Sequence, residues 1–186
     1  MEVKVSKVTD WTRVLNAARM TVHKEAVDKM PSHTFKQAIM LAEHSPIRTL
    51  EYDVIIKDIP SYVAGHLVRH FIGVIPFVVT SRPDRGGKPR DEQKKTDPVD
   101  MQLSINSQAL INISRKRLCC CAEEDTRKVW HAVKDAIMAI DPEVGRVMVR
   151  ECVYRGFCPE MKCCGFCKTK AFDAMRNVYV KLAKNE

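Results

Sequence analysis

Residues 106 to 117, Asn-Ser-Gln-Ala-Leu-Ile-Asn-Ile-Ser-Arg-Lys-Arg, predict a helix with an unusual distribution of polar side chains. Five amides and guanidinium groups are interleaved with its aliphatic residues: Asn106, Gln108, Asn112, Arg115 and Arg117. We expect a helix from about 105 to 118, in which Asn106 and Arg117 share a face about 16 Å apart. Polar residues at this separation can bind the two ends of an elongated ligand. Alternatively, they simply face solvent on the outer side of the helix. The pattern alone leaves both interpretations open.

Before this helix, the sequence predicts two covering helices, a strand, a third helix and a second strand. Asp10 and Ser32 are the caps of the first two helices. Period-two alternation over 50–57 predicts a half-buried strand. Pro60 suits the first position of a helix that reaches His70. Residues 71–80 are β-branched and aromatic and contain a proline, which predicts an edge or bulged strand.

After the 106–117 helix, we expect a helix over 123–140 with a core stripe through Trp130, Val133, Ile137 and Ile140, and a short helix that restarts near Pro142. The last helix is predicted over about 168–183. Four of its residues are expected to be buried: Phe172, Met175, Tyr179 and Leu182.

Length and composition favour one domain over residues 1–186, with a Cys-rich segment at 152–167. Hydrophobic residues are 45% and charged residues 29% of the chain, which excludes disordered and collagen-like classes. The longest apolar run, 71–79, is too short to span a membrane. The first ten residues lack the apolar stretch of a secretory signal, so a cytoplasmic location is expected.

The charge balance points to phosphate-bearing partners. Lys plus Arg is 31 and Asp plus Glu is 23, a net charge of +8, which favours nucleic acid, nucleotides or cofactors, unless it serves solubility alone. Arg69 and His70 precede a Gly- and Pro-rich loop that offers Ser81, Arg82 and Arg85. These groups can surround an anion, and solvated loop charges are the alternative.

Eight cysteines fall in a run at 119–121 and a cluster at 152–167. In a chain without an export signal, they are expected to be reduced thiols or metal ligands. The candidates for a structural zinc site are Cys158, Cys163, Cys164 and Cys167, of which the last two have the two-residue gap typical of zinc ligands. Free or buried thiols are the alternative.

Three ordered blocks resemble the flavin-dependent thymidylate synthase family. The strongest is the 106–117 helix, and the second is His66-Leu-Val-Arg69-His70, which is similar to the family's signature helix. Ser81-Arg82 resembles the serine and arginine of the family's nucleotide loop, and His44 resembles its histidine near the flavin. Two positions depart from the pattern: Gln108 stands where the family usually has arginine, and Phe71 replaces a basic residue.

The resemblance implies an α+β fold with helices packed around a mainly antiparallel sheet, assembled as a homotetramer with shared sites. It implies FAD as the cofactor, dUMP as the substrate, and methylene-tetrahydrofolate and NADPH as co-substrates. Substrate binding is expected at His66, Arg69, Ser81, Arg82, Arg85 and Arg117, with Arg117 also catalytic through stabilisation of the ionised pyrimidine. Flavin binding is expected at His44, Arg69, His70, Asn106, Gln108 and Asn112.

Two other functions compete with thymidylate synthesis. The first keeps flavin, folate and dUMP but hydroxymethylates the pyrimidine. The second is a basic, zinc-stapled module that binds nucleic acid through the 82–95 loop. The few aromatic residues lie mostly in core stripes, so the stacking platform of a single-strand binder is not visible in the sequence.

Overall fold

One antiparallel sheet organises the protein, of which a computed structural model describes residues 1–184. Its strands are β1 (Glu2–Lys7), β2 (Glu51–Pro60), β3 (Val74–Val78) and β4 (Pro98–Asn106), in the spatial order β1-β2-β4-β3. At the centre of the sheet, Val54 of β2 lies opposite Leu103 of β4. The expected α+β class with a mainly antiparallel sheet is confirmed.

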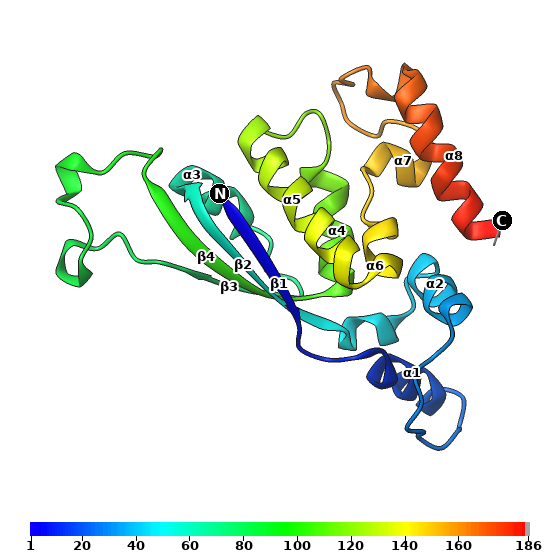
Figure 1. Cartoon of the computed structure of the whole chain (residues 1–186). Coiled ribbons are helices and arrows are strands. Elements are labelled where there is room, and N and C mark those ends of the chain that lie inside the picture. The colour runs from blue at the N-terminus through cyan, green and yellow to red at the C-terminus, as the bar shows by residue number, and fades with distance from the viewer. Residues whose placement is uncertain (185–186) are drawn as a thin grey trace.

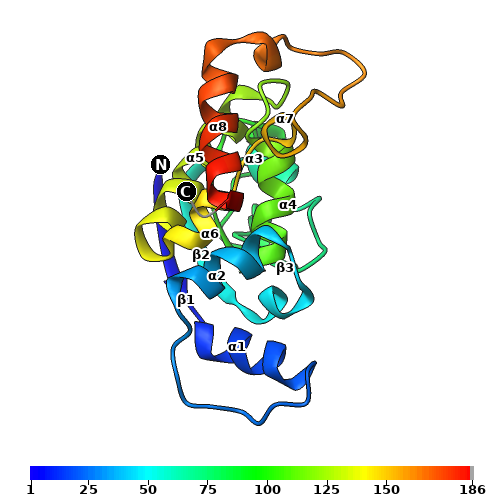
Figure 2. The ribbon, with the colours of Figure 1, turned by 90° about the vertical axis from the view of Figure 1, so that its right-hand side faces the viewer.

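Helices cover one face of this sheet (Figure 1). They are α1 (Trp11–Met20), α2 (His33–Leu41), α3 (Ser61–Leu67), α4 (Ser107–Arg117), α5 (Glu124–Ile140), α6 (Pro142–Val147), α7 (Glu151–Arg155) and α8 (Lys170–Lys184). Short 3₁₀ turns lie at Ser45–Thr49, Pro83–Arg85, Arg90–Glu92 and Phe166–Lys168. The helices α4, α5 and α6 run beside the sheet, α1 and α2 lie toward one end, and α7 and α8 lie on the outer side (Figures 1 and 2). No helix within residues 1–184 is long and apolar enough to cross a membrane.

The core lies between the sheet and α4 and α5. Alternate side chains of β2, such as Tyr52 and Val54, are completely buried there, as is Trp130 of α5. Each large side chain buried in this way stabilises the fold by about 1.5–3 kcal/mol. The indole Nε1 of Trp130 also donates to Ser114 Oγ at 2.9 Å. This bond ties α5 to α4, so the core fixes the helix that carries most of the candidate site.

A buried carboxylate joins four elements at the end of α5. Asp141, 2% exposed, accepts hydrogen bonds from Trp11 Nε1 at 2.9 Å and from the Tyr52 hydroxyl at 2.8 Å. Lys7 Nζ forms an ion pair with it at 2.6 Å. The carboxylate therefore has both hydrogen-bond donors and a countercharge, which a buried charge requires.

Several sequence-based boundaries need correction. Asn106 ends β4 and caps α4 from an extended conformation, so it does not lie on a helical face with Arg117. Pro60 ends β2 and stands at the cap position of α3, so that helix begins one residue after the predicted place, and it ends at Leu67 and does not reach His70. The strand predicted over 71–80 begins only at Val74 and ends at Val78. Met175 is 45% exposed on α8 and Ile140 is 41% exposed at the end of α5, contrary to the prediction that both are buried.

Candidate functional site

Arg117, the last residue of α4, is held by the end of α3. Its Nε donates to His70 Nε2 at 2.8 Å, and its Nη2 donates to the His66 carbonyl at 2.9 Å. Because His70 Nε2 accepts this bond, the ring is neutral and carries its proton on Nδ1. Burial, together with the nearby Arg117 charge, lowers the pKa of His70 and keeps it neutral. Burial also lowers the pKa of Arg117, as does the charge of Arg69. The site thus places the half-buried Arg117 guanidinium near the charge of the exposed Arg69.

The orientation of α3 is fixed by hydrogen bonds to α5. His66 Nδ1 lies 2.8 Å from Thr126 Oγ1, whose hydroxyl donates to Glu123 at 3.0 Å. The Thr126 hydroxyl is therefore the acceptor for His66. The Tyr62 hydroxyl donates to Asp125 at 2.5 Å, and this bond raises the pKa of Tyr62 to about 12. The histidine predicted to bind substrate is thus fixed through Nδ1, which leaves its Nε2 for other partners.

A second polar group surrounds Glu43, next to His44. Gln108 Nε2 donates to one oxygen of Glu43 at 2.7 Å, and the Arg115 guanidinium forms an ion pair with the other. Gln108 also donates to Asn112 Oδ1 at 3.3 Å. Arg115 stacks on the Tyr154 ring, 3.7 Å from its centroid. Glu43 and Arg115 were not among the predicted site residues, because two groups 72 positions apart give no local signal of a pair.

Asn106 closes the other end of α4 against the start of β3. Its Oδ1 accepts the Ala109 N–H at 2.9 Å, and its own N–H donates to the Gly73 carbonyl at 3.0 Å. Gly73 has φ +74°, and a Cβ there would lie 2.7 Å from the Asn106 amide nitrogen. Only glycine fits this close approach. A cavity of about 370 Å³ beside them is lined partly by Phe71, the departure from the family signature.

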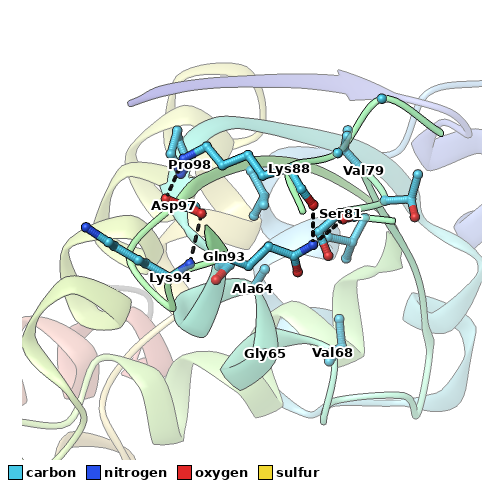
Figure 3. A pocket seen from close by; sticks show the side chains of 16 residues that line it. Ala64, Gly65, Val68, Val79, Ser81, Lys88, Gln93, Lys94, Asp97 and Pro98 are labelled. Carbon is cyan, nitrogen blue, oxygen red and sulfur yellow. Dashed lines mark hydrogen bonds and ion pairs between the residues drawn. The ribbon is translucent and has the colours of Figure 1, made fainter. Parts of the chain in front are cut away.

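The loop after β3 forms a larger cavity of about 570 Å³ with α3 (Figure 3). Ser81 lines it together with Val68, next to Arg69 in sequence. Gln93 Nε2 donates to the Ser81 carbonyl at 2.8 Å and so fixes the loop. Arg82 does not line the cavity and forms an ion pair with Asp84 at 2.7 Å, and Arg85 is exposed outside it.

Within one chain, the predicted site residues therefore lie in several separate places. One group is His66, Arg69, His70 and Arg117, and a second is Gln108 and Asn112 near Glu43. His44 adjoins Glu43 in sequence but lines a separate cavity with residues of α1 and α2. Asn106 stands at the Gly73 turn, and Ser81, Arg82 and Arg85 lie in the loop. Their assigned roles stay predictions.

All eight cysteines are free thiols. Within residues 1–184, no group of three or more His, Cys, Asp or Glu side chains is arranged to hold a metal ion. Zinc binding by Cys158, Cys163, Cys164 and Cys167 consequently stays a prediction without structural support.

This chain is similar to known proteins in its fold, but no similarity to them is found at the level of sequence. No family model and no curated protein matches the chain. A solved structure of the flavin-dependent thymidylate synthase ThyX from Helicobacter pylori, complexed with FAD and dUMP, matches with a TM-score of 0.66 at 15% identity, over 81% of this chain and 100% of that chain. The chain has the fold of the flavin-dependent thymidylate synthases.

Two further structures have the same thymidylate synthase fold. A second Helicobacter pylori structure with FAD and dUMP has a TM-score of 0.60 at 16% identity, over 73% of this chain and 93% of that one. The UMP/dUMP methylase PolB from Streptomyces cacaoi, bound with 5-Br dUMP, has a TM-score of 0.60 at 13% identity, over 84% of this chain and 96% of that one. The fold expected from the sequence blocks is confirmed.

Proposed function

We propose that this chain is an FAD-dependent enzyme that acts on dUMP, and that it methylates dUMP reductively to dTMP with methylene-tetrahydrofolate and NADPH. The observation that carries the proposal is the position of Arg117. On a fold whose solved examples bind dUMP or 5-Br dUMP, it stands at the end of α4, fixed by the two hydrogen bonds that it donates to His70 and to the His66 carbonyl.

Arg117 is suited to an anionic pyrimidine. Its Nε and Nη2 are engaged by His70 and His66, while its Nη1 makes no hydrogen bond within the described chain. Nη1 is therefore the donor that we assign to the pyrimidine oxygen, where negative charge develops during the reaction. A donor that is oriented before the reaction stabilises such charge without reorganisation. Arg69 is exposed, makes no ion pair within residues 1–184, and is assigned to phosphate.

The residues around Glu43 fit a flavin. The exposed Asn112 side chain accepts a hydrogen bond from Gln108 through Oδ1, which leaves its amide nitrogen for the polar edge of the ring. His44 follows Glu43 in sequence and is exposed, so its ring can also hydrogen-bond to the cofactor. Arg115 neutralises Glu43, so the carboxylate does not repel the anionic cofactor. FAD would be held by His44, Gln108 and Asn112, with Asn106, His70 and Arg69 toward its remaining parts.

When bound, FAD supplies the redox chemistry of the reaction. The chain orients the substrate through Arg117, and the neutral His70 ring holds that guanidinium in place. Phosphate-binding groups neutralise the charge of substrate and cofactor, consistent with the net charge of +8.

We further propose a homotetramer in which the loop residues Ser81, Arg82 and Arg85 complete the site of a neighbouring subunit. This assembly explains how a chain of 186 residues can serve several large ligands. Light scattering of the purified protein tests it, and a monomer in the presence of FAD and dUMP would contradict it.

The experiment that tests the function has two stages. Purified protein is first examined for flavin absorbance and for FAD binding by fluorescence, and inability to bind FAD would overturn the proposal. The holoenzyme is then incubated with dUMP, methylene-tetrahydrofolate and NADPH, and the nucleotide product is identified by mass spectrometry. Thymidylate is expected.

A hydroxymethylated nucleotide would establish the alternative flavin- and folate-dependent activity. The observation that favours this alternative is Gln108, which takes the usual arginine position and is bonded to Glu43. Salt-dependent oligonucleotide binding without FAD binding would instead favour the nucleic-acid module.

A further inference from the structure

The segment between α7 and α8 contains two thiols in direct contact. The Sγ atoms of Cys163 and Cys167 lie 3.6 Å apart. Cys163 is exposed and Cys167 is half-buried, so small oxidants can reach the pair from solvent. Neither cysteine has a role in the proposed nucleotide chemistry.

The backbone around Cys163 stabilises its thiolate. The Gly165 N–H donates to Cys163 Sγ at 3.3 Å. Gly165 adopts φ +83°, a left-handed conformation that glycine reaches without strain and that turns the chain back toward Cys163. This N–H lowers the pKa of Cys163, aided by the neighbouring thiols and by Lys168. The thiolate is the nucleophilic form of cysteine.

Four other thiols have raised pKa values. Contact with Cys163 raises the pKa of Cys167. Burial is the main cause that raises the pKa of Cys152, and also that of Cys121, to about 11. Cys158 also contacts Cys163, and its pKa is raised. Cys163 thus lies in contact with Cys167 and accepts the Gly165 N–H, which is the arrangement of an attacking and a resolving thiol.

We propose that Cys163 and Cys167 form a modification site at which a hydroperoxide oxidises the two thiols to a disulfide. In the first step the Cys163 thiolate attacks the peroxide, the O–O bond breaks, and the leaving alkoxide or hydroxide takes a proton to give an alcohol or water. Cys163 becomes a sulfenic acid.

In the second step Cys167 attacks the sulfur of this sulfenic acid. The S–O bond breaks, and hydroxide leaves with the proton of the Cys167 thiol as water. The two thiols lose two electrons in total, and the peroxide is reduced by two. The new bond closes the turn that precedes α8 and fixes the end of the Cys-rich segment.

Peptide mapping of the full-length protein tests this site. Reduced protein is treated with one equivalent of hydrogen peroxide, remaining thiols are alkylated, and the protein is digested with trypsin. Cleavage after Lys162 and Lys168 places both cysteines in one peptide, 163–168, and cleavage after Arg155 places Cys158 in another. The 163–168 peptide is expected to lose two hydrogen atoms while its Cys164 is alkylated.

Three variants make the test specific. Cys163→Ser is expected to abolish the oxidised peptide. Cys167→Ser is expected to leave a sulfenic acid at Cys163 that a cyclic 1,3-dione traps. Cys164→Ser, in the same peptide, serves as the matched control and is expected to oxidise as the parent does.

The proposal fails if peroxide links peptide 163–168 to the peptide of Cys158, or if it pairs Cys164 with Cys167. It also fails if the purified protein holds one zinc ion per chain that protects Cys163 and Cys167 from alkylation before oxidant is added. These readouts do not depend on dUMP or FAD, so they are independent of the proposed function.

Discussion

The Nε of Arg117 donates a hydrogen bond of 2.8 Å to Nε2 of His70, across 47 positions of sequence. The bond requires a neutral imidazole, because a protonated ring offers no acceptor to the guanidinium. The direction of the arginine side chain therefore depends on the protonation state of the histidine.

Replacing Arg117 tests its role in turnover. Arg117→Ala is expected to lower kcat by about 10²- to 10³-fold, because a donor oriented toward developing charge is lost. Arg117→Lys keeps the charge but not the planar fork that engages both His70 and His66, so it should recover activity only in part. Steady-state kinetics on the holoenzyme measure both. Lys116→Ala is the control, since Lys116 pairs with Glu160 on the surface at 3.2 Å; equal losses in the control and in Arg117→Ala would contradict the assignment.

Stability is expected to depend on the neutrality of His70. Its pKa in the fold is lowered from 6.5 by burial and by Arg117, so the unfolded chain binds the proton more tightly. The contribution of neutral His70 to the free energy of unfolding is therefore fully present above pH 6.5. It is lost as the pH falls through the lower pKa that His70 has in the folded state. Urea denaturation from pH 7.5 to 5 measures this loss. His70→Gln, which keeps an acceptor but does not titrate, should show a smaller decrease, and an identical pH dependence would refute the prediction.

The turn at Gly73 is expected to tolerate no side chain. Gly73→Ala should lower the free energy of unfolding by about 1–3 kcal/mol, because its φ of +74° is strained for alanine and the new Cβ would displace the Asn106 amide. Gly65→Ala on α3 is the matched control, since nothing described lies within 4 Å of a Cβ there. It should be neutral or slightly stabilising. Chemical denaturation measures the free energy of unfolding of both variants. An unchanged value for Gly73→Ala would contradict the prediction and show that the turn adapts to a side chain.

Asp141 is expected to be the most sensitive polar residue of the core. Asp141→Ala should cost about 3–5 kcal/mol, because it leaves Lys7 without its countercharge and two buried donors without an acceptor. Asp135→Ala, at an exposed position of α5, should change stability by less than about 0.5 kcal/mol. Thermal and urea unfolding provide the comparison. A small effect at Asp141 would mean that solvent replaces its bonds.

Glu43→Gln tests whether the second polar group supports the flavin. The change keeps the shape of the side chain but removes the partner of the Arg115 charge and weakens the bond to Gln108. FAD affinity, measured by flavin fluorescence, is expected to fall about tenfold, the effect of one charged hydrogen bond. Glu124→Gln, in an exposed pair with Lys128, should bind FAD as the parent does. Unchanged affinity in Glu43→Gln would separate this group from the cofactor.

Local patterns were sufficient for much of the fold. Asp10 and Ser32 cap α1 and α2 as predicted, because a cap needs only its own side chain and the next three residues. β2 and α5 also follow from their periodicity. The predictions missed β1 and β4, although Val99, Met101, Leu103 and Ile105 alternate in the way that predicts a strand.

The sequence by itself determined which residues are exceptional: an amide- and arginine-rich helix, the Arg69-His70 pair and the clustered cysteines. Only the tertiary structure decided their partners. Arg117 meets His70, Glu43 meets Arg115, and Gly165 turns back to Cys163. The physical reason is that periodicity and caps act over one or two turns, whereas long-range pairs depend on the order of the strands and on how the core places α4 against α3.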